Sequence, residues 1–116
     1  MSGGMHIFVL REFQKWLSEE KPLPDGAKFF SQRPDQCPLA WFLIVVHRYR
    51  VPEIKGKTAF WYQGHVFTER SLPKWARVYA SLVDTRYIPG EPMTLEQARE
   101  ALQETIIAMK VPERLN

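Results

Sequence analysis

The segment from Arg33 to Arg50 constrains the fold of this chain more than any other. Prolines break the chain before a run of nine apolar residues, Pro38 to Val46, and basic residues follow the run. The run is about half of the ~20 residues that a membrane-spanning helix needs. It therefore predicts a buried helix at the centre of a small domain, and no membrane span.

The residues that flank this central helix predict its boundaries. Asp35 is a good N-cap, and Pro38 fits the first turn, where its missing N–H would have no partner. The helix is expected to reach about Tyr49 and to end before Pro52. Apolar side chains occur around its whole circumference, so it must be covered on several sides. These side chains are Leu39, Ala40, Trp41, Phe42, Leu43, Ile44, Val45 and Val46.

Apolar periodicity and capping residues predict three further helices. Large apolar residues recur at steps of three and four in Met5–Glu20, which predicts the first helix. Ser71 is expected to cap a third helix, with Pro73 in its first turn and its end near Arg86. The pattern Thr94–Gln97 is a capping box, which predicts the start of the last helix.

The rest of the chain predicts one hairpin and one domain. Residues 57–68 are rich in β-branched and aromatic types and are split by Gln63-Gly64, which favours a β-hairpin. Phe29 and Phe30 are expected to fold back onto the core from a proline-rich loop. The fold class is therefore α+β and mostly helical, with four helices and one β-hairpin between helices two and three. At 116 residues we expect a disordered end at 1–4 and a single globular domain at 5–116.

Several short segments resemble a class of small proteins encoded by bacteria and their phages. The segments are Asp35-Gln36-Cys37-Pro38-Leu39-Ala40, Leu72-Pro73-Lys74-Trp75-Ala76, Val83-Asp84 and Thr94-Leu95. The resemblance covers residues 33–108 and implies a phage or mobile-element setting. Small phage proteins of this build, such as anti-CRISPR inhibitors, commonly act by binding a host or defence complex. The resemblance implies no catalytic residues.

The residues that could support catalysis are few. Cys37 with His47 or His65 could form a nucleophile and base, because a thiol needs a nearby imidazole to become a thiolate at neutral pH. A position in the first turn of the central helix would lower the thiol pKa through the helix dipole. The sequence offers no third group to orient the pair, so we interpret Cys37 as structural. The histidines, His6 included, lack metal-ligand spacing, and we predict no catalytic residue, metal or cofactor.

A basic cluster between His47 and Arg77 is the main surface feature of the sequence. This segment contains seven Lys or Arg against two acids, whereas the rest of the chain contains more acids than bases. Aromatic residues are interleaved with these charges, as in nucleic-acid stacking sites and in protein hot spots. The alternative is that the charges point to different sides of a hairpin and two helix ends. The predicted partner-binding residues are Arg48, Arg50, Lys55, Lys57, Trp61, Tyr62, Arg70, Lys74 and Arg77.

The sequence therefore predicts a non-enzymatic small binding protein that associates stoichiometrically with a macromolecular partner. The resemblance suggests a phage-encoded inhibitor whose partner is a host or defence protein or a ribonucleoprotein complex, in the cytoplasm of a bacterial cell. One alternative is a nucleic-acid-binding accessory domain, although no helix-turn-helix, zinc-finger or RNA-recognition signature is present. A second alternative is an enzyme with an unrecognised Cys/His site.

Overall fold

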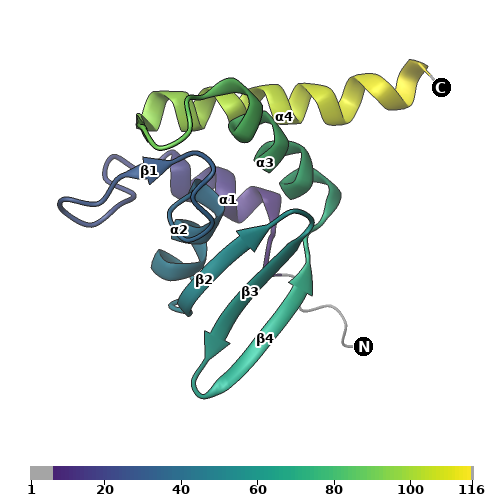
Figure 1. The fold of residues 1–116 in the computed structure, drawn as a ribbon. Helices are drawn as coiled ribbons and strands as arrows, with labels where there is room; N and C mark the ends of the chain where they lie inside the picture. The colour runs from purple at the N-terminus through teal and green to yellow at the C-terminus, as the bar shows by residue number, and fades with distance from the viewer. Residues whose placement is uncertain (1–6, 116) are drawn as a thin grey trace.

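Residues 7–115 fold into four helices, a three-stranded antiparallel sheet and one short strand pair (Figure 1). The computed structural model describes residues 7–115, with side chains through residue 110, so the predictions for residues 1–4 lie outside the described part. The α+β class and the four helices are confirmed. The elements are α1 (Leu10–Leu17), β1 (Phe29–Phe30), α2 (Pro38–Val45), β2 (Arg50–Lys55), β3 (Thr58–Gln63), β4 (Val66–Ser71), α3 (Lys74–Arg86), β5 (Pro92–Met93) and α4 (Leu95–Leu115).

The predicted hairpin is part of a larger sheet. Its strands are β3 and β4, and β2 adds a third strand that the sequence analysis missed. The β3–β4 turn is Gly64-His65, one residue later than predicted. The turn between β2 and β3 is Gly56-Lys57. In both turns the first residue is a glycine with positive φ, +59° at Gly56 and +67° at Gly64, the arrangement of a type II′ hairpin turn.

A bulge explains how β2 accommodates a proline. The pairing of β2 with β3 shifts between Arg50 and Glu53, so β2 contains one residue more than β3 there. Val51 lies in this bulge with φ 49°, and the next residue, Pro52, is fully buried. Beyond the bulge, Ile54 pairs with Ala59 and its side chain is buried. A proline in a strand segment normally argues against a strand, and the bulge removes that conflict.

The core is centred on Phe13 of α1, at the point where the first three helices meet. The ring centroid of Phe13 lies 5.3 Å from that of Phe42 on α2 and 5.1 Å from that of Tyr79 on α3. Trp75 adds a further ring at 5.3 Å, and its indole N–H donates to the Phe8 carbonyl. These edge-on and tilted pairs are the arrangements that aromatic rings prefer.

Helix α2 is central but shorter than predicted. Its N-cap is Cys37 rather than Asp35, and it ends at Val45 instead of Tyr49. Arg48, with φ 61°, turns the chain back into β2. Five of its eight residues are buried, whereas three are partly exposed and the following Val46 is 39% exposed. The helix is therefore covered on most of its circumference, but one side remains open to solvent.

The remaining helices show which local signals were reliable. The backbone N–H of Gln97 donates to Thr94 Oγ1 at 3.0 Å, and the Gln97 side-chain oxygen accepts from the Thr94 N–H at 2.9 Å, so the predicted capping box is confirmed. Helix α3 ends at Arg86 as predicted, but its N-cap is Pro73, because Ser71 still belongs to β4. Helix α1 is shorter at both ends than the prediction of Met5–Glu20, of which 5–6 lie outside the described residues.

The long loop after α1 packs onto the body of the protein through a small strand pair. Phe29 pairs with Met93 and Phe30 with Pro92, and both Phe29 and Met93 are buried. The expectation that these phenylalanines return to the core is therefore confirmed for Phe29, whereas Phe30 is only half-buried. In the part of the chain that the structure describes, no helix combines the length and the apolar character that crossing a membrane would require.

Candidate interaction surfaces

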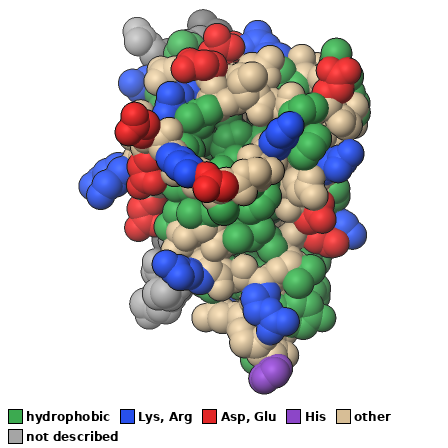
Figure 2. Space-filling model, turned by 90° about the vertical axis from the view of Figure 1, so that its left-hand side faces the viewer, with side chains coloured by type: hydrophobic (Ala, Val, Ile, Leu, Met, Phe, Trp, Pro, Cys, Tyr) green, Lys and Arg blue, Asp and Glu red, His purple; other side chains and the backbone are tan. Residues whose placement is uncertain are grey.

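The predicted basic patch does not form one continuous surface. Arg50 begins β2 and Arg48 lies in the loop before it, whereas Lys55 ends β2, about 15 Å away at the usual rise of a strand, and Lys57 lies in the turn that follows. Figure 2 shows basic and acidic side chains mixed around one face of the molecule, with hydrophobic side chains between them. The structure places some of the predicted residues on two separate surfaces, which are described below, and the others on neither.

Trp61 was wrongly predicted to face a partner. It points into the core from β3, is 2% exposed, and stacks on Tyr49 with 5.0 Å between ring centroids. Its indole N–H has no hydrogen-bond partner within the described residues. Its neighbour Tyr62 is 40% exposed, because successive residues of a strand point to opposite faces. The sequence identified the right strand but not its exposed side.

The first surface is the face of the sheet that is turned away from the helices, which we call the outer sheet face. Three aromatic rings meet there: Phe60 and Tyr62 from β3 and Phe67 from β4. Phe67 stacks on Phe60 with 5.9 Å between ring centroids, and the Tyr62 ring lies 5.2 Å from Phe67. Phe67 is 55% exposed. Phe60 and Phe67 were not among the predicted partner-binding residues, although their alternation with Trp61 and Thr68 would have placed them on this face.

The outer sheet face carries a balanced set of charges around these rings. Arg50 pairs with Tyr62 across the strands, and Lys55 lies at the other end of β2. Glu53 and Glu69 both pair with Phe60, one from each side. The Lys55 Nζ lies 3.2 Å from a Glu53 carboxylate oxygen. Within the described part of the chain, the two bases and two acids of this face offset one another, in contrast to the basic patch that the sequence predicted.

The second surface is an open groove along the exposed side of α3, which we call the α3 groove. Its volume is about 710 Å³. The Gly56-Lys57 turn forms one wall, and Lys74 and Arg77 line it from the first turn of α3. The groove therefore collects three of the predicted basic residues. Arg70 and Arg48 line neither surface: Arg70 is exposed on the helix-facing side of edge strand β4, and Arg48 lies in the loop before β2.

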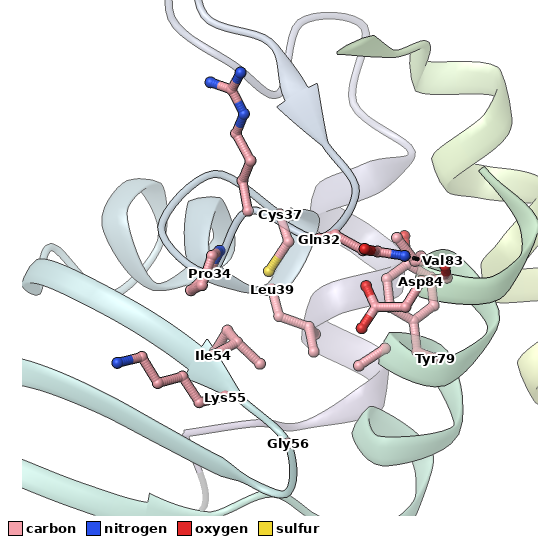
Figure 3. Close-up of a pocket in the computed structure, with 12 residues that line it drawn as sticks. Gln32, Pro34, Cys37, Leu39, Ile54, Lys55, Gly56, Tyr79, Val83 and Asp84 are labelled. Carbon is pink, nitrogen blue, oxygen red and sulfur yellow. Dashed lines mark hydrogen bonds between the residues drawn. The ribbon is translucent and has the colours of Figure 1, made fainter. Parts of the chain in front are cut away.

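Cys37 lines a separate pocket of about 350 Å³, between the loop before α2, the end of β2 and α3 (Figure 3). Its sulfur points into this pocket together with the carboxylate of Asp84. Burial raises the pKa of the Cys37 thiol to about 12, although backbone N–H groups at the start of α2 act in the opposite direction. The start of the helix therefore does lower the pKa of the thiol, as its position in the sequence suggested, but desolvation outweighs this effect and the net shift is upward.

The structure does not bring Cys37 together with a histidine. Neither His47 nor His65 lines the Cys37 pocket. His65 lies in the exposed β3–β4 turn, and His47 is packed between Phe42 and Tyr49, with ring distances of 5.1 and 5.6 Å. His6 lies outside the described residues. A protonated thiol without an adjacent base is a poor nucleophile, so this pocket gives no support to a Cys/His site.

A burial effect of the same kind acts on Asp84, which borders both the Cys37 pocket and the α3 groove. Partial burial raises the pKa of its carboxyl group, and a hydrogen bond from the Gln32 backbone counteracts this in part. The Gln32 side-chain amide donates in turn to the Asp84 carbonyl at 2.7 Å. Asp84 therefore ties the loop before α2 to α3 through both its carboxyl group and its backbone carbonyl.

No family model matches this chain, and no curated protein or solved structure matches it.

Proposed function

We propose that this protein is a non-enzymatic binding protein that forms a stoichiometric complex with a protein partner through its outer sheet face. The observation that supports the proposal is the group of three touching aromatic rings, Phe60, Tyr62 and Phe67, on a sheet face that no described helix covers. Exposed aromatic clusters supply a large part of the binding energy in protein interfaces. Surrounding polar and charged residues give such a surface the usual polar rim.

The charge of the outer sheet face favours a protein over a nucleic acid. Sites for single-stranded nucleic acid combine stacking rings with an excess of Lys and Arg that follows the phosphate backbone. Here Glu53 and Glu69 flank the rings and offset Arg50 and Lys55. A polyanion would meet two carboxylates at the centre of the site. The outer sheet face therefore has the aromatic rings that a nucleic-acid site needs, but it lacks the excess of positive charge.

The test compares two variants that remove exposed apolar side chains in different places. The first is the double variant Tyr62→Ser with Phe67→Ser on the outer sheet face. The matched control is Ile88→Ser in the loop after α3, where the side chain is 62% exposed. Both should remain folded, as circular dichroism and thermal unfolding can verify. Each protein is immobilised and exposed to a bacterial lysate, and retained proteins are quantified by mass spectrometry.

We expect at least one protein to be retained equally by the wild type and Ile88→Ser and to be lost from the double variant. The same retained set on all three would contradict the proposal. A labelled dT20 oligonucleotide tests the alternative, since tight binding that depends on Tyr62 and Phe67 would favour nucleic acid. The identity of the partner as a host or defence complex stays a prediction from the resemblance, and the retained proteins would test it.

A further inference from the structure

The α3 groove shares no residue with the outer aromatic rings and presents a different chemistry. Three cations line it, Lys57 from the β2–β3 turn and Lys74 and Arg77 from α3. Among the residues that the structure describes, Asp84 is the one acid that lines it, at the end where the groove meets the Cys37 pocket. The ion pairs found among the described residues do not include any of these three cations. The groove therefore has an uncompensated positive charge at one end.

The position of two of these cations at the start of a helix increases the positive charge at this end of the groove. Lys74 and Arg77 lie in the first turn of α3, which contains no acidic residue. The N-cap is Pro73, and no side chain caps the helix there. Helix N-termini carry a partial positive charge and normally favour Asp or Glu in this turn. The helix start and the two side chains therefore add their charges at the same place, and an incoming carboxylate would be attracted by all three.

The floor of the groove is aliphatic. Val78 and Leu82 of α3 are half-buried along it, and Ala80 continues the floor toward the Cys37 pocket. The described residues of the lining include no aromatic ring on which a nucleic-acid base could stack. A nucleic acid would therefore contact three cations without a stacking platform, whereas a peptide with apolar and acidic side chains would match both the floor and the rim.

We propose that the α3 groove docks an amphipathic, acidic segment of a protein partner. Apolar side chains of the segment lie on Val78 and Leu82, and its carboxylates contact Lys57, Lys74 and Arg77. This interaction does not depend on the outer sheet face, so the two surfaces can be tested separately.

The experiment selects ligands from a random library of displayed 15-residue peptides on the immobilised wild type. The double variant Lys74→Glu with Arg77→Glu serves for counter-selection. The matched control is Arg11→Glu with Arg48→Glu, which changes the net charge equally and places one of the two glutamates in the first turn of α1. Selected peptides are synthesised with a fluorophore, and their dissociation constants are measured by fluorescence anisotropy at low and high salt.

We expect the selected peptides to be net acidic with apolar residues at helical spacing. The groove variant should bind them at least tenfold more weakly, and the control should bind them within twofold of the wild type. A Leu82→Ser variant, which leaves the charges unchanged, should also weaken binding several-fold because it removes part of the floor.

Three results would overturn the proposal. The first is a selected set without acidic enrichment. The second is equal weakening by the groove variant and the control, which would indicate a long-range charge effect only. The third is occupation of the groove by another molecule: either dT20 binding that depends on Lys74 and Arg77, or a concentration-dependent dimer in light scattering that the groove variant abolishes.

Discussion

Replacement of Lys74 by glutamate should stabilise the fold while it disables the α3 groove. Lys74 is the exposed first residue of α3, in a turn without acids or a side-chain cap. The change removes one unfavourable interaction with the helix dipole and adds one favourable interaction, each typically ~0.3–1 kcal/mol. It also converts repulsion from Arg77, three residues away, into attraction of a few tenths of a kcal/mol. Because the site is exposed, we take the low end and expect about 1 kcal/mol in total.

Thermal unfolding provides the assay. The unfolding entropy of a 116-residue chain is about 0.24 kcal/mol/K, so 1 kcal/mol corresponds to a rise in Tm of about 4 °C. Circular dichroism at 20 mM and 300 mM NaCl should show that salt reduces this gain, because the interaction is screened. Lys74→Gln should give about half of the gain. Lys57→Glu, in a turn outside the helix, should give less. An unchanged or lower Tm for Lys74→Glu at low salt would refute the argument.

Three further changes test the core, the bulge and the buried polar groups. Leu43→Ala should lower the free energy of unfolding, measured in urea, by about 3 kcal/mol, because Leu43 is fully buried and the cavity left behind adds to the lost transfer energy. A loss below about 0.5 kcal/mol would show that α2 is not part of the core. Val51→Gly should raise the unfolding free energy by roughly 0.5–1 kcal/mol, because Val51 has φ 49° and glycine relieves the strain of that conformation at some entropic cost. A loss of stability would contradict the bulge geometry. Asp84→Asn should stabilise the protein at pH 7, because burial raises the pKa of Asp84 and so penalises its ionised form. The gain in unfolding free energy should shrink as the pH falls toward 4, where the carboxyl group takes up a proton. A gain that grows at low pH would show that burial does not raise this pKa.

Cys37 allows one more measurement. With a pKa of about 12, only about one thiol in 10⁵ is ionised at pH 7. A thiol-specific colour reagent should therefore react with the native protein orders of magnitude more slowly than with the urea-unfolded chain. Equal rates would indicate an exposed and activated thiol, and would revive the enzyme alternative.

Local sequence rules determined much of the helical part of this protein. The capping box at Thr94 and the end of α3 at Arg86 each depend on residues within a few positions of one another, so the chain segment alone carries the information. The apolar run that begins at Pro38 also predicted a helix in the core without knowledge of its neighbours. What the sequence overestimated was length: α1 ends at Leu17 and α2 at Val45, and Arg48 with φ 61° then turns the chain toward β2.

The tertiary structure decided the third strand and the exposed surfaces. In isolation, the segment that forms β2 contains a proline and alternating charges, and it becomes a strand because β3 pairs with it and α2 covers Ile54. The burial of Trp61 and the exposure of Tyr62 depend on which face of that sheet meets the helices. The basic residues of this segment do not form one patch, since β2 separates Arg50 from Lys57, whereas Lys57, Lys74 and Arg77 line the same groove. The pKa of Cys37 likewise depends on the tertiary structure. Its position at a helix start can be predicted from the sequence, whereas its desolvation depends on the elements that pack around it.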